Sequence, residues 1–234
     1  MRCAIVQPSY IPWRGYFDLI RRVDLFVFYD DVQYDRRGWR NRNRIKTAQG
    51  TRWLTIPVHA RGAQTERLPI HTIRTVDSEW PRHHLEGLRR AYGGAPYFRD
   101  FSSWLEARYA SPGPSLADFT ISLVMEIAAK LGYRTRFVRS STLDASGSRT
   151  ERLLDVLGKV GASRYLSGPS ARAYIDERQF AERDIALEWM SYDYPEYPQL
   201  HPPYDPHVSI LDLLFMTGDR AAHYIRGPAQ TIGG

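Results

Sequence analysis

A short turn near the start of the chain, at residues 7–16, combines polar side chains with a stiff backbone. Gln7, Arg14 and Tyr16 are its hydrogen-bonding groups, and two prolines restrict the backbone around them. The turn follows an apolar run, and ligands of α/β sheets bind where loops leave the carboxyl ends of strands. A turn that is merely packed by its prolines and Trp13 is the alternative, and we favour a binding site.

Two adjacent carboxylates, Asp30 and Asp31, stand at the end of the next apolar run. Enclosed like charges raise one another's pKa, so one of the two is suited to act as a general base. The pair could also ligate a hard cation, or lie in a solvated turn or in ion pairs with the arginines that follow. We predict that the catalytic base is Asp30 or Asp31.

A third segment, residues 39–46, alternates arginine with asparagine behind a tryptophan. In an extended segment this pattern places several donors on one side, which suits a phosphate, a sulfate or a nucleotide tail; an exposed basic loop is the alternative. We predict cations that neutralise an anionic group, amides that orient the substrate together with Gln7, and aromatic walls. The cations are Arg42, Arg44 and Lys46, with Arg14 as an additional candidate; the amides are Asn41 and Asn43; the walls are Trp39 and Tyr34.

A strand–turn–helix pattern at residues 165–170 places Ser167 and Ser170 near the start of a helix. Serine in this position caps a helix by accepting a hydrogen bond from a backbone N–H. The same helix end could bind an anion through its free N–H groups. Both interpretations stay open, and both serines are substrate-binding candidates.

The positive charge of the chain comes almost entirely from arginine. The 234 residues carry a formal net charge of +6, and Lys46, Lys130 and Lys159 are the only lysines. A GC-rich genome would produce this bias, and so would binding of phosphate, sulfate or carboxylate by guanidinium groups. The arginines are dispersed and no nucleic-acid-binding motif is present, which disfavours nucleic acid as a partner.

Several familiar motifs are absent from the sequence. There is no Gly-rich phosphate loop, no G-x-G-x-x-G, no G-x-S-x-G and no Cys/His metal spacing, and we predict neither a cofactor nor a metal. The single cysteine, Cys3, excludes an intramolecular disulfide and indicates a reducing compartment. Without a signal peptide or an apolar run of membrane-spanning length, the chain is expected in the cytoplasm and not in a membrane.

Alternating strands and helices must position these groups. Apolar runs at 2–7 and 24–29 flank an amphipathic helix at 15–22, which is the opening of a right-handed βαβ unit. Further strands are expected at 51–58, 67–76, 135–140, 164–167 and 185–190, a loop at 30–50, and helices at 78–92, 98–110, 115–131, 148–160, 170–176 and 208–217. This alternation predicts the α/β class, with a doubly wound, mostly parallel, Rossmann-like sheet. We expect a single domain at 1–226, with a mostly helical insertion (a subdomain) at about 78–132 and a flexible tail at 227–234.

Four stretches that follow one another through nearly the whole chain carry a family resemblance. They are QPSYIPWRGYFDLIRRVDLFVFYDDVQYDRRGWRNRNRIKTAQGTRWLTIPV, EWPRHHLEGLRRAYGGAPYF, GSRTERLLDVLGKVGASRYLSGPSARAYI and HVSILDLLFMTG. On these stretches the chain resembles the WbqC-like family. The resemblance implies a role in biosynthesis, because the family is known from gene clusters for O-antigen, other surface polysaccharides and natural products. It assigns no reaction.

The first strand, the Pro-Trp-Arg-Gly-Tyr turn and the next helix are also similar, more weakly, to the start of nucleotidylyltransferases of the HIGH type. Residues 165–170 fall where those enzymes carry a second phosphate-binding Ser/Thr turn. Both signature histidines are absent, with Pro12 or Trp13 and Tyr16 nearby instead. The similarity therefore implies a nucleotidylyltransferase-like fold and an anion pocket, and not adenylyl transfer by the usual route.

The combined expectation is a biosynthetic enzyme that holds an anionic, activated metabolite between the turn at 7–16, the loop at 30–46 and the turn at 167–170. It would be a transferase or a ring-forming cyclase, acting by group transfer or displacement on a phosphate- or sulfate-activated amino or sugar compound. The expected partner is this small anionic substrate, with another enzyme of the pathway as an open alternative. The rival interpretation is a non-catalytic protein that binds a pathway enzyme through the aromatic surface around 192–204.

Overall fold

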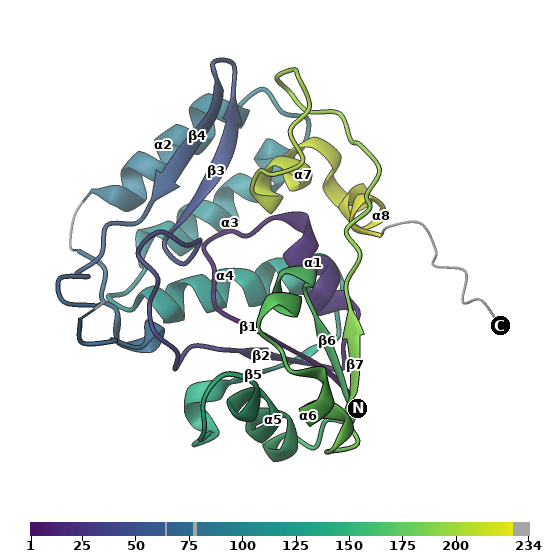
Figure 1. Cartoon of the computed structure of the whole chain (residues 1–234). Coiled ribbons are helices and arrows are strands. Elements are labelled where there is room, and N and C mark those ends of the chain that lie inside the picture. Colours follow the sequence, from purple (N-terminus) through teal and green to yellow (C-terminus); the bar gives the residue numbers. More distant parts are fainter. Residues whose placement is uncertain (64, 77–78, 227–234) are drawn as a thin grey trace.

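A five-stranded parallel sheet forms the centre of the protein, as Figure 1 shows in the computed structural model, which describes residues 1–63, 65–76 and 79–226. Its strands are β1 (Arg2–Val6), β2 (Leu25–Phe28), β5 (Arg136–Arg139), β6 (Arg164–Ser167) and β7 (Ala186–Trp189). They lie in the order β5-β2-β1-β6-β7, and each neighbouring pair is parallel. The chain winds outward from β1 on one side and then crosses to β6, which confirms the predicted doubly wound α/β fold.

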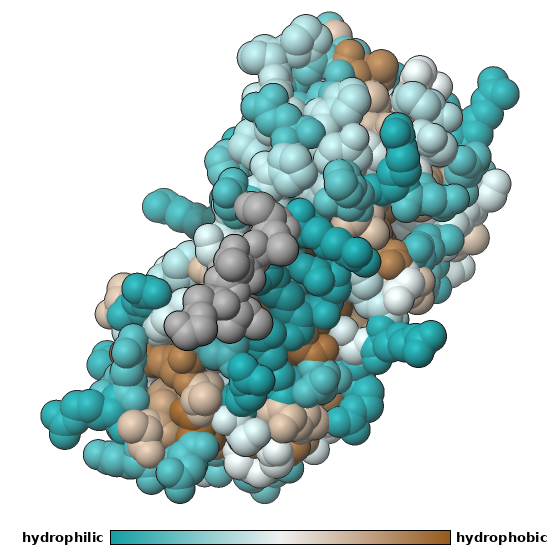
Figure 2. Space-filling model, turned by 90° about the vertical axis from the view of Figure 1, so that its right-hand side faces the viewer, coloured by the Kyte–Doolittle hydropathy of each residue, from teal (hydrophilic) through white to brown (hydrophobic). Residues whose placement is uncertain are grey.

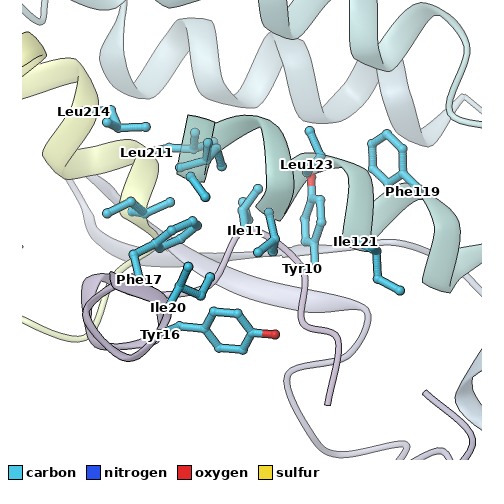
Figure 3. Close-up of a cluster of buried hydrophobic side chains, with 14 of the residues drawn as sticks. Tyr10, Ile11, Tyr16, Phe17, Ile20, Phe119, Ile121, Leu123, Leu211 and Leu214 are labelled. Carbon is cyan, nitrogen blue, oxygen red and sulfur yellow. The ribbon is translucent and has the colours of Figure 1, made fainter. Parts of the chain in front are cut away.

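Both faces of the sheet are covered, and accordingly β2 and the part of β1 after Arg2 consist of apolar residues. β1 reads RCAIV and β2 reads LFVF, without the alternation of a strand that has one wet face. One core contains α1 (Arg14–Arg21), α4 (Leu116–Lys130), α7 (Ile210–Thr217) and α8 (Ala221–Ile225), and the other contains α5 (Arg149–Lys159) and α6 (Glu177–Ala181). Figure 3 shows part of the first core, where Ile11 and Phe17 lie near Leu211 of α7.

A second sheet of two strands corrects the loop predicted at 30–50. β3 (Arg42–Thr47) and β4 (Gly50–Thr55) form an antiparallel hairpin. β3 was not predicted because its residues are almost all polar. Its buried Asn43 donates hydrogen bonds to backbone carbonyls of the loop after β1. The strand predicted at 67–76 is wrong: this segment holds a 3₁₀ helix (Ile70–Thr72) and isolated bridges, because Pro69 has no N–H to extend a ladder.

The helices predicted between the hairpin and β5 are present as α2 (Trp80–Tyr92), α3 (Phe98–Ala110) and α4. α4 shares its core with α1 and β2, whereas α2 packs on α3 and on β3. Three further 3₁₀ helices lie at Ser140–Thr142, Pro169–Ala173 and Gly218–Arg220, the second of them in place of the helix expected at 170–176. The flexible tail predicted at 227–234 lies outside the described residues.

The chain between β7 and α7 runs as a long segment without regular secondary structure, residues 190–209, which we call the strap. Figure 1 shows it leading upward from β7 past α8 to α7. On the side of the molecule that Figure 2 shows, hydrophilic residues cover most of the surface and apolar residues form separate patches. Across the described ranges, none of the helices combines the length and the apolar character needed to span a bilayer.

Candidate functional site

A cavity of about 430 Å³ lies at the carboxyl ends of β1 and β6, where the strand order reverses. Open parallel sheets bind ligands at this switch point, and the volume is within the range of small-molecule pockets. We call it the switch-point pocket. It is lined by Ile5, Val6, Ser9, Pro12, Trp13, Tyr16, Leu19, Trp39, Arg40, Asn43, Arg44, Tyr165, Ser167, Gly168, Ser170, Ala171, Tyr174, Tyr192 and His207.

The loop between β1 and α1, which forms one wall of the pocket, has a strained backbone. Ile11 has a φ of +36°, a conformation that β-branched residues rarely adopt. The Asn43 amide donates to the carbonyls of Tyr10 (3.1 Å) and Ile11 (2.9 Å), and the Tyr10 N–H donates to the Trp39 carbonyl (3.1 Å). Strain of this kind persists where surrounding contacts fix the backbone, and it is concentrated at functional sites.

Trp13 forms an aromatic wall between this loop and the strap. Its indole lies so close to Gly15 that a Cβ at residue 15 would come within 2.3 Å of the ring. The ring also packs edge-on against Tyr192 of the strap, with centroids 5.0 Å apart. A glycine at residue 15 therefore leaves room for the Trp13 indole.

The Arg40 guanidinium lines the pocket without a hydrogen-bond acceptor for two of its nitrogen atoms. Its Nε and Nη1 atoms are buried without a hydrogen bond, and the ion pairs of the described residues do not include it. Burial lowers the pKa of Arg40, and the nearby Tyr16 phenol and Asp35 carboxylate oppose this shift only in part. An enclosed guanidinium without an acceptor is costly, so an anion that enters the pocket would relieve it.

Other predicted residues line the same pocket. Arg44 donates from Nη2 to the His207 carbonyl (2.9 Å), and its buried Nε has no partner. Ser167 donates to the Tyr165 hydroxyl at 3.4 Å. The structure therefore brings together the predicted residues Tyr16, Trp39, Asn43, Arg44, Ser167 and Ser170.

Arg14 and Lys46 hold the strap and lie outside the pocket lining. Arg14 donates to the Pro195 carbonyl (2.8 Å) and the Tyr204 hydroxyl (2.7 Å). Lys46 donates from Nζ to the Pro203 carbonyl. Both cations were predicted to bind the substrate, and here they bind the segment that carries two pocket residues.

Four more predicted residues lie outside the lining. Arg42 donates from Nη2 to the backbone carbonyl of Arg37 (2.6 Å), and Asn41 donates from Nδ2 to the backbone carbonyl of Ile56 (2.8 Å). The Tyr16 hydroxyl donates a hydrogen bond to the backbone carbonyl of Gln7 (3.1 Å). Tyr34 is buried, and burial raises its pKa to about 12. Of these four residues, Gln7 contacts the pocket lining, through Tyr16.

Asp30 and Asp31, at the end of β2, also lie outside the lining and are surrounded by donors. The buried Asp30 accepts from Arg139 Nε (2.7 Å), and from the N–H (3.0 Å) and hydroxyl (2.9 Å) of Ser141. Asp31 accepts from Arg152 Nη2 at 2.6 Å. The two carboxylates fix the segment after β5 against the end of β2.

Sequence reasoning passed over Arg40, His207 and Tyr192, which line the pocket. Arg40 belongs to the same alternating run as Arg42 and Arg44, and no pattern within the run indicates that Arg40 and Arg44 line the pocket whereas Arg42 does not. His207 and Tyr192 come from the strap, whose path leaves no periodic signal in the sequence.

A second hollow, of about 660 Å³, lies beside the start of α2 and the segment at 112–114. Of its three charged residues, Glu79 and Arg82 are paired with each other at 2.7 Å, and Glu106 is paired with Arg89 at 2.9 Å. Within the described ranges, no three His, Cys, Asp or Glu side chains are grouped as metal ligands. The switch-point pocket, with its unpartnered cation, is therefore the candidate functional site.

Fold and site together define a doubly wound α/β protein with a basic, aromatic-walled pocket at the switch point of its sheet. The chain belongs to the WbqC-like protein family, whose model matches residues 7–224. An uncharacterized protein of Mycobacterium tuberculosis is 43% identical over 227 residues, which make up 96% of this chain and 97% of that protein. No solved structure matches the chain. The family resemblance is thereby confirmed.

Proposed function

We propose that this chain is a cytoplasmic biosynthetic enzyme that transfers or displaces a group on an anionic metabolite bound in the switch-point pocket. The observation that carries the proposal is Arg40, whose buried Nε and Nη1 have no partner. A guanidinium in this state can donate charge-assisted hydrogen bonds to a phosphate or sulfate. The buried and unpartnered Nε of Arg44 offers a further donor in the same pocket.

The pocket suits a displacement in which charge develops on a leaving oxygen. An amine or hydroxyl attacks the activated carbon, the carbon–oxygen bond to the phosphate or sulfate breaks, and its electron pair leaves with the oxygen. Arg40 would neutralise that charge in a site of low dielectric, where such a contact is strong. When the attacking group belongs to the same molecule, a ring forms.

The attacking group must lose one proton, and we assign its acceptance to the His207 imidazole. His207 lines the pocket, and its backbone is held by Arg44 at the carbonyl and by Asp205 at the N–H (2.8 Å). A general base must come within hydrogen-bond reach of the proton that it accepts. Asp30 and Asp31, the acids that the sequence suggested for this role, are engaged with Arg139 and Arg152 instead.

Titration calorimetry with inorganic phosphate, sulfate and phosphorylated amino compounds tests the proposal. Arg40→Gln should weaken binding by at least about tenfold, the loss of a charge-assisted contact. Arg42→Gln is the matched control, because its guanidinium lies outside the pocket; its affinity should stay within about twofold of wild type. Undiminished binding by Arg40→Gln, or loss of binding in the control instead, would reject the proposal.

A further inference from the structure

Exposed large apolar side chains gather at the mouth of the switch-point pocket. Trp39 (42% exposed) and Tyr174 (63%) line the pocket, and Trp53 (47%) packs on Trp39 with ring centroids 5.2 Å apart. Among the described residues, Met125 on α4 is the remaining exposed one, at 41%. Covering exposed aromatic rings with a partner lowers the free energy of the system. The position of these rings therefore points to a ligand that extends to the mouth of the pocket.

Trp39 makes contacts through both its backbone and its ring. Its backbone carbonyl accepts the Tyr10 N–H, which ties residue 39 to the strained loop, and its ring is tilted by 37° against Trp53. The Arg44 guanidinium lies 5.9 Å from the centroid of the same ring. An electron-rich ring beside a cation is a platform for a flat ring that is joined to an anion.

Arg40 indicates where that anion lies. It follows Trp39 directly in the chain, yet its Nε and Nη1 atoms are buried whereas the indole is exposed. The two residues therefore divide the ligand, with the anion inside and the flat ring at the mouth. The cavity of about 430 Å³ between them lies at the switch point, where parallel sheets bind nucleotides.

We infer that the anionic metabolite is a nucleoside phosphate, with its phosphate on Arg40 and its base stacked on Trp39. The inference rests on the proposed function and adds the base as a second recognised group. A sugar phosphate would use Arg40 in the same way but would leave the indole of Trp39 in water. Stacking of one base on an indole corresponds to an affinity gain of about tenfold or more.

Calorimetric titrations of the full chain with AMP, UMP, ribose 5-phosphate and inorganic phosphate separate these contributions. AMP or UMP should bind at least about tenfold more tightly than ribose 5-phosphate, which carries the same phosphate without a base. Trp39→Ala should abolish this preference and leave the affinity for ribose 5-phosphate unchanged, and Trp39→Phe should keep most of the preference. Met125→Ala, which removes an exposed side chain outside the pocket, should change neither; circular dichroism verifies that each variant is folded.

Each outcome decides between the two proposals. Equal affinities for AMP, UMP and ribose 5-phosphate that still depend on Arg40 would overturn the nucleoside inference and leave the proposed function standing. A preference for AMP or UMP that survives Trp39→Ala would overturn the stacking site. Failure of the folded wild type to bind any phosphate, sulfate or phosphorylated probe would overturn both.

Discussion

Two neighbouring places at the carboxyl ends of the strands differ in whether their charged side chains are paired. At the end of β2, Asp30 and Asp31 are held by Arg139 and Arg152. At the ends of β1 and β6, Arg40 is enclosed without an acceptor. Both places follow apolar strands and both are rich in charged residues, so only the packing around them distinguishes one from the other.

The topology of the sheet explains this difference. β5 lies beside β2, and the 3₁₀ helix that follows β5 brings Ser140 and Ser141 onto the carboxylates at the end of β2. Between β1 and β6 the chain departs in opposite directions, so the crevice stays open. A paired charge in a closed site indicates structure, and an unpaired one indicates a binding site.

The largest effect on stability is expected when the ion pair at the end of β2 is broken. Asp30→Ala removes the acceptor of Arg139 and of Ser141, and should lower the free energy of unfolding by about 3–5 kcal/mol, the usual cost of breaking a buried pair. Asp118→Ala is the control, since it removes the exposed partner of the same arginine and should cost less than about 1 kcal/mol. Urea unfolding measures both. Wild-type stability of Asp30→Ala together with lost ligand binding would return Asp30 to the active site.

A second prediction concerns His84, a paired polar group behind the pocket loop. Its ring nitrogens lie 2.8 Å from the Tyr10 hydroxyl and 3.2 Å from the Thr55 carbonyl, and burial lowers its pKa from 6.5 to about 4. Because the folded pKa is below the unfolded one, this stabilisation is present above pH 6.5 and is lost as the pH falls through 4. The loss amounts to about 3 kcal/mol.

Thermal or urea unfolding between pH 7 and pH 4 checks this prediction. His84→Gln should flatten the dependence of stability on pH in that window, because the amide does not titrate. His83→Gln, at the exposed neighbouring position on α2, should leave the dependence as in wild type. An equally steep profile in His84→Gln would assign the effect to other groups.

The smallest of the three effects on stability concerns Asn43, which holds the loop beside the switch-point pocket. Asn43→Ala leaves the carbonyls of Tyr10 and Ile11 without their donors, and should cost about 1–3 kcal/mol of stability. Because the strained loop relaxes, the affinity for phosphate should fall as well. Asn41→Ala, which removes a donor to the Ile56 carbonyl away from the pocket, should reduce stability without reducing that affinity. Parallel losses in both variants would deny Asn43 a specific role.

The fold was predictable from the sequence because it rests on local patterns. The apolar runs of β1 and β2 around an amphipathic α1 define a βαβ unit, and the long helices between the hairpin and β5 show ordinary periodicity. The strand predicted at 51–58 is present as β4 (Gly50–Thr55), whereas β3 was missed because Arg42 and Arg44 give it no apolar face. The stability of β3 comes in part from contacts with distant segments.

Of the candidate site, the sequence predicted where the pocket lies but not what its individual side chains do. The turn after β1 and the turn after β6 meet at the switch point as their strand ends require. The tasks of individual side chains depend on partners far away in the chain: Arg14 reaches Pro195 and Lys46 reaches Pro203, both in the strap. No spacing in the sequence reveals that these cations are occupied and that Arg40 is not.

The most direct test of the central claim is a crystal structure of the chain grown with AMP. The expected result is a phosphate oxygen within about 2.7–2.9 Å of Arg40 Nε or Nη1, with the adenine against the Trp39 indole. A pocket in which Arg40 pairs with a carboxylate of its own chain, such as Asp35, while the phosphate binds elsewhere, would contradict the assignment of the switch-point pocket as the anion site.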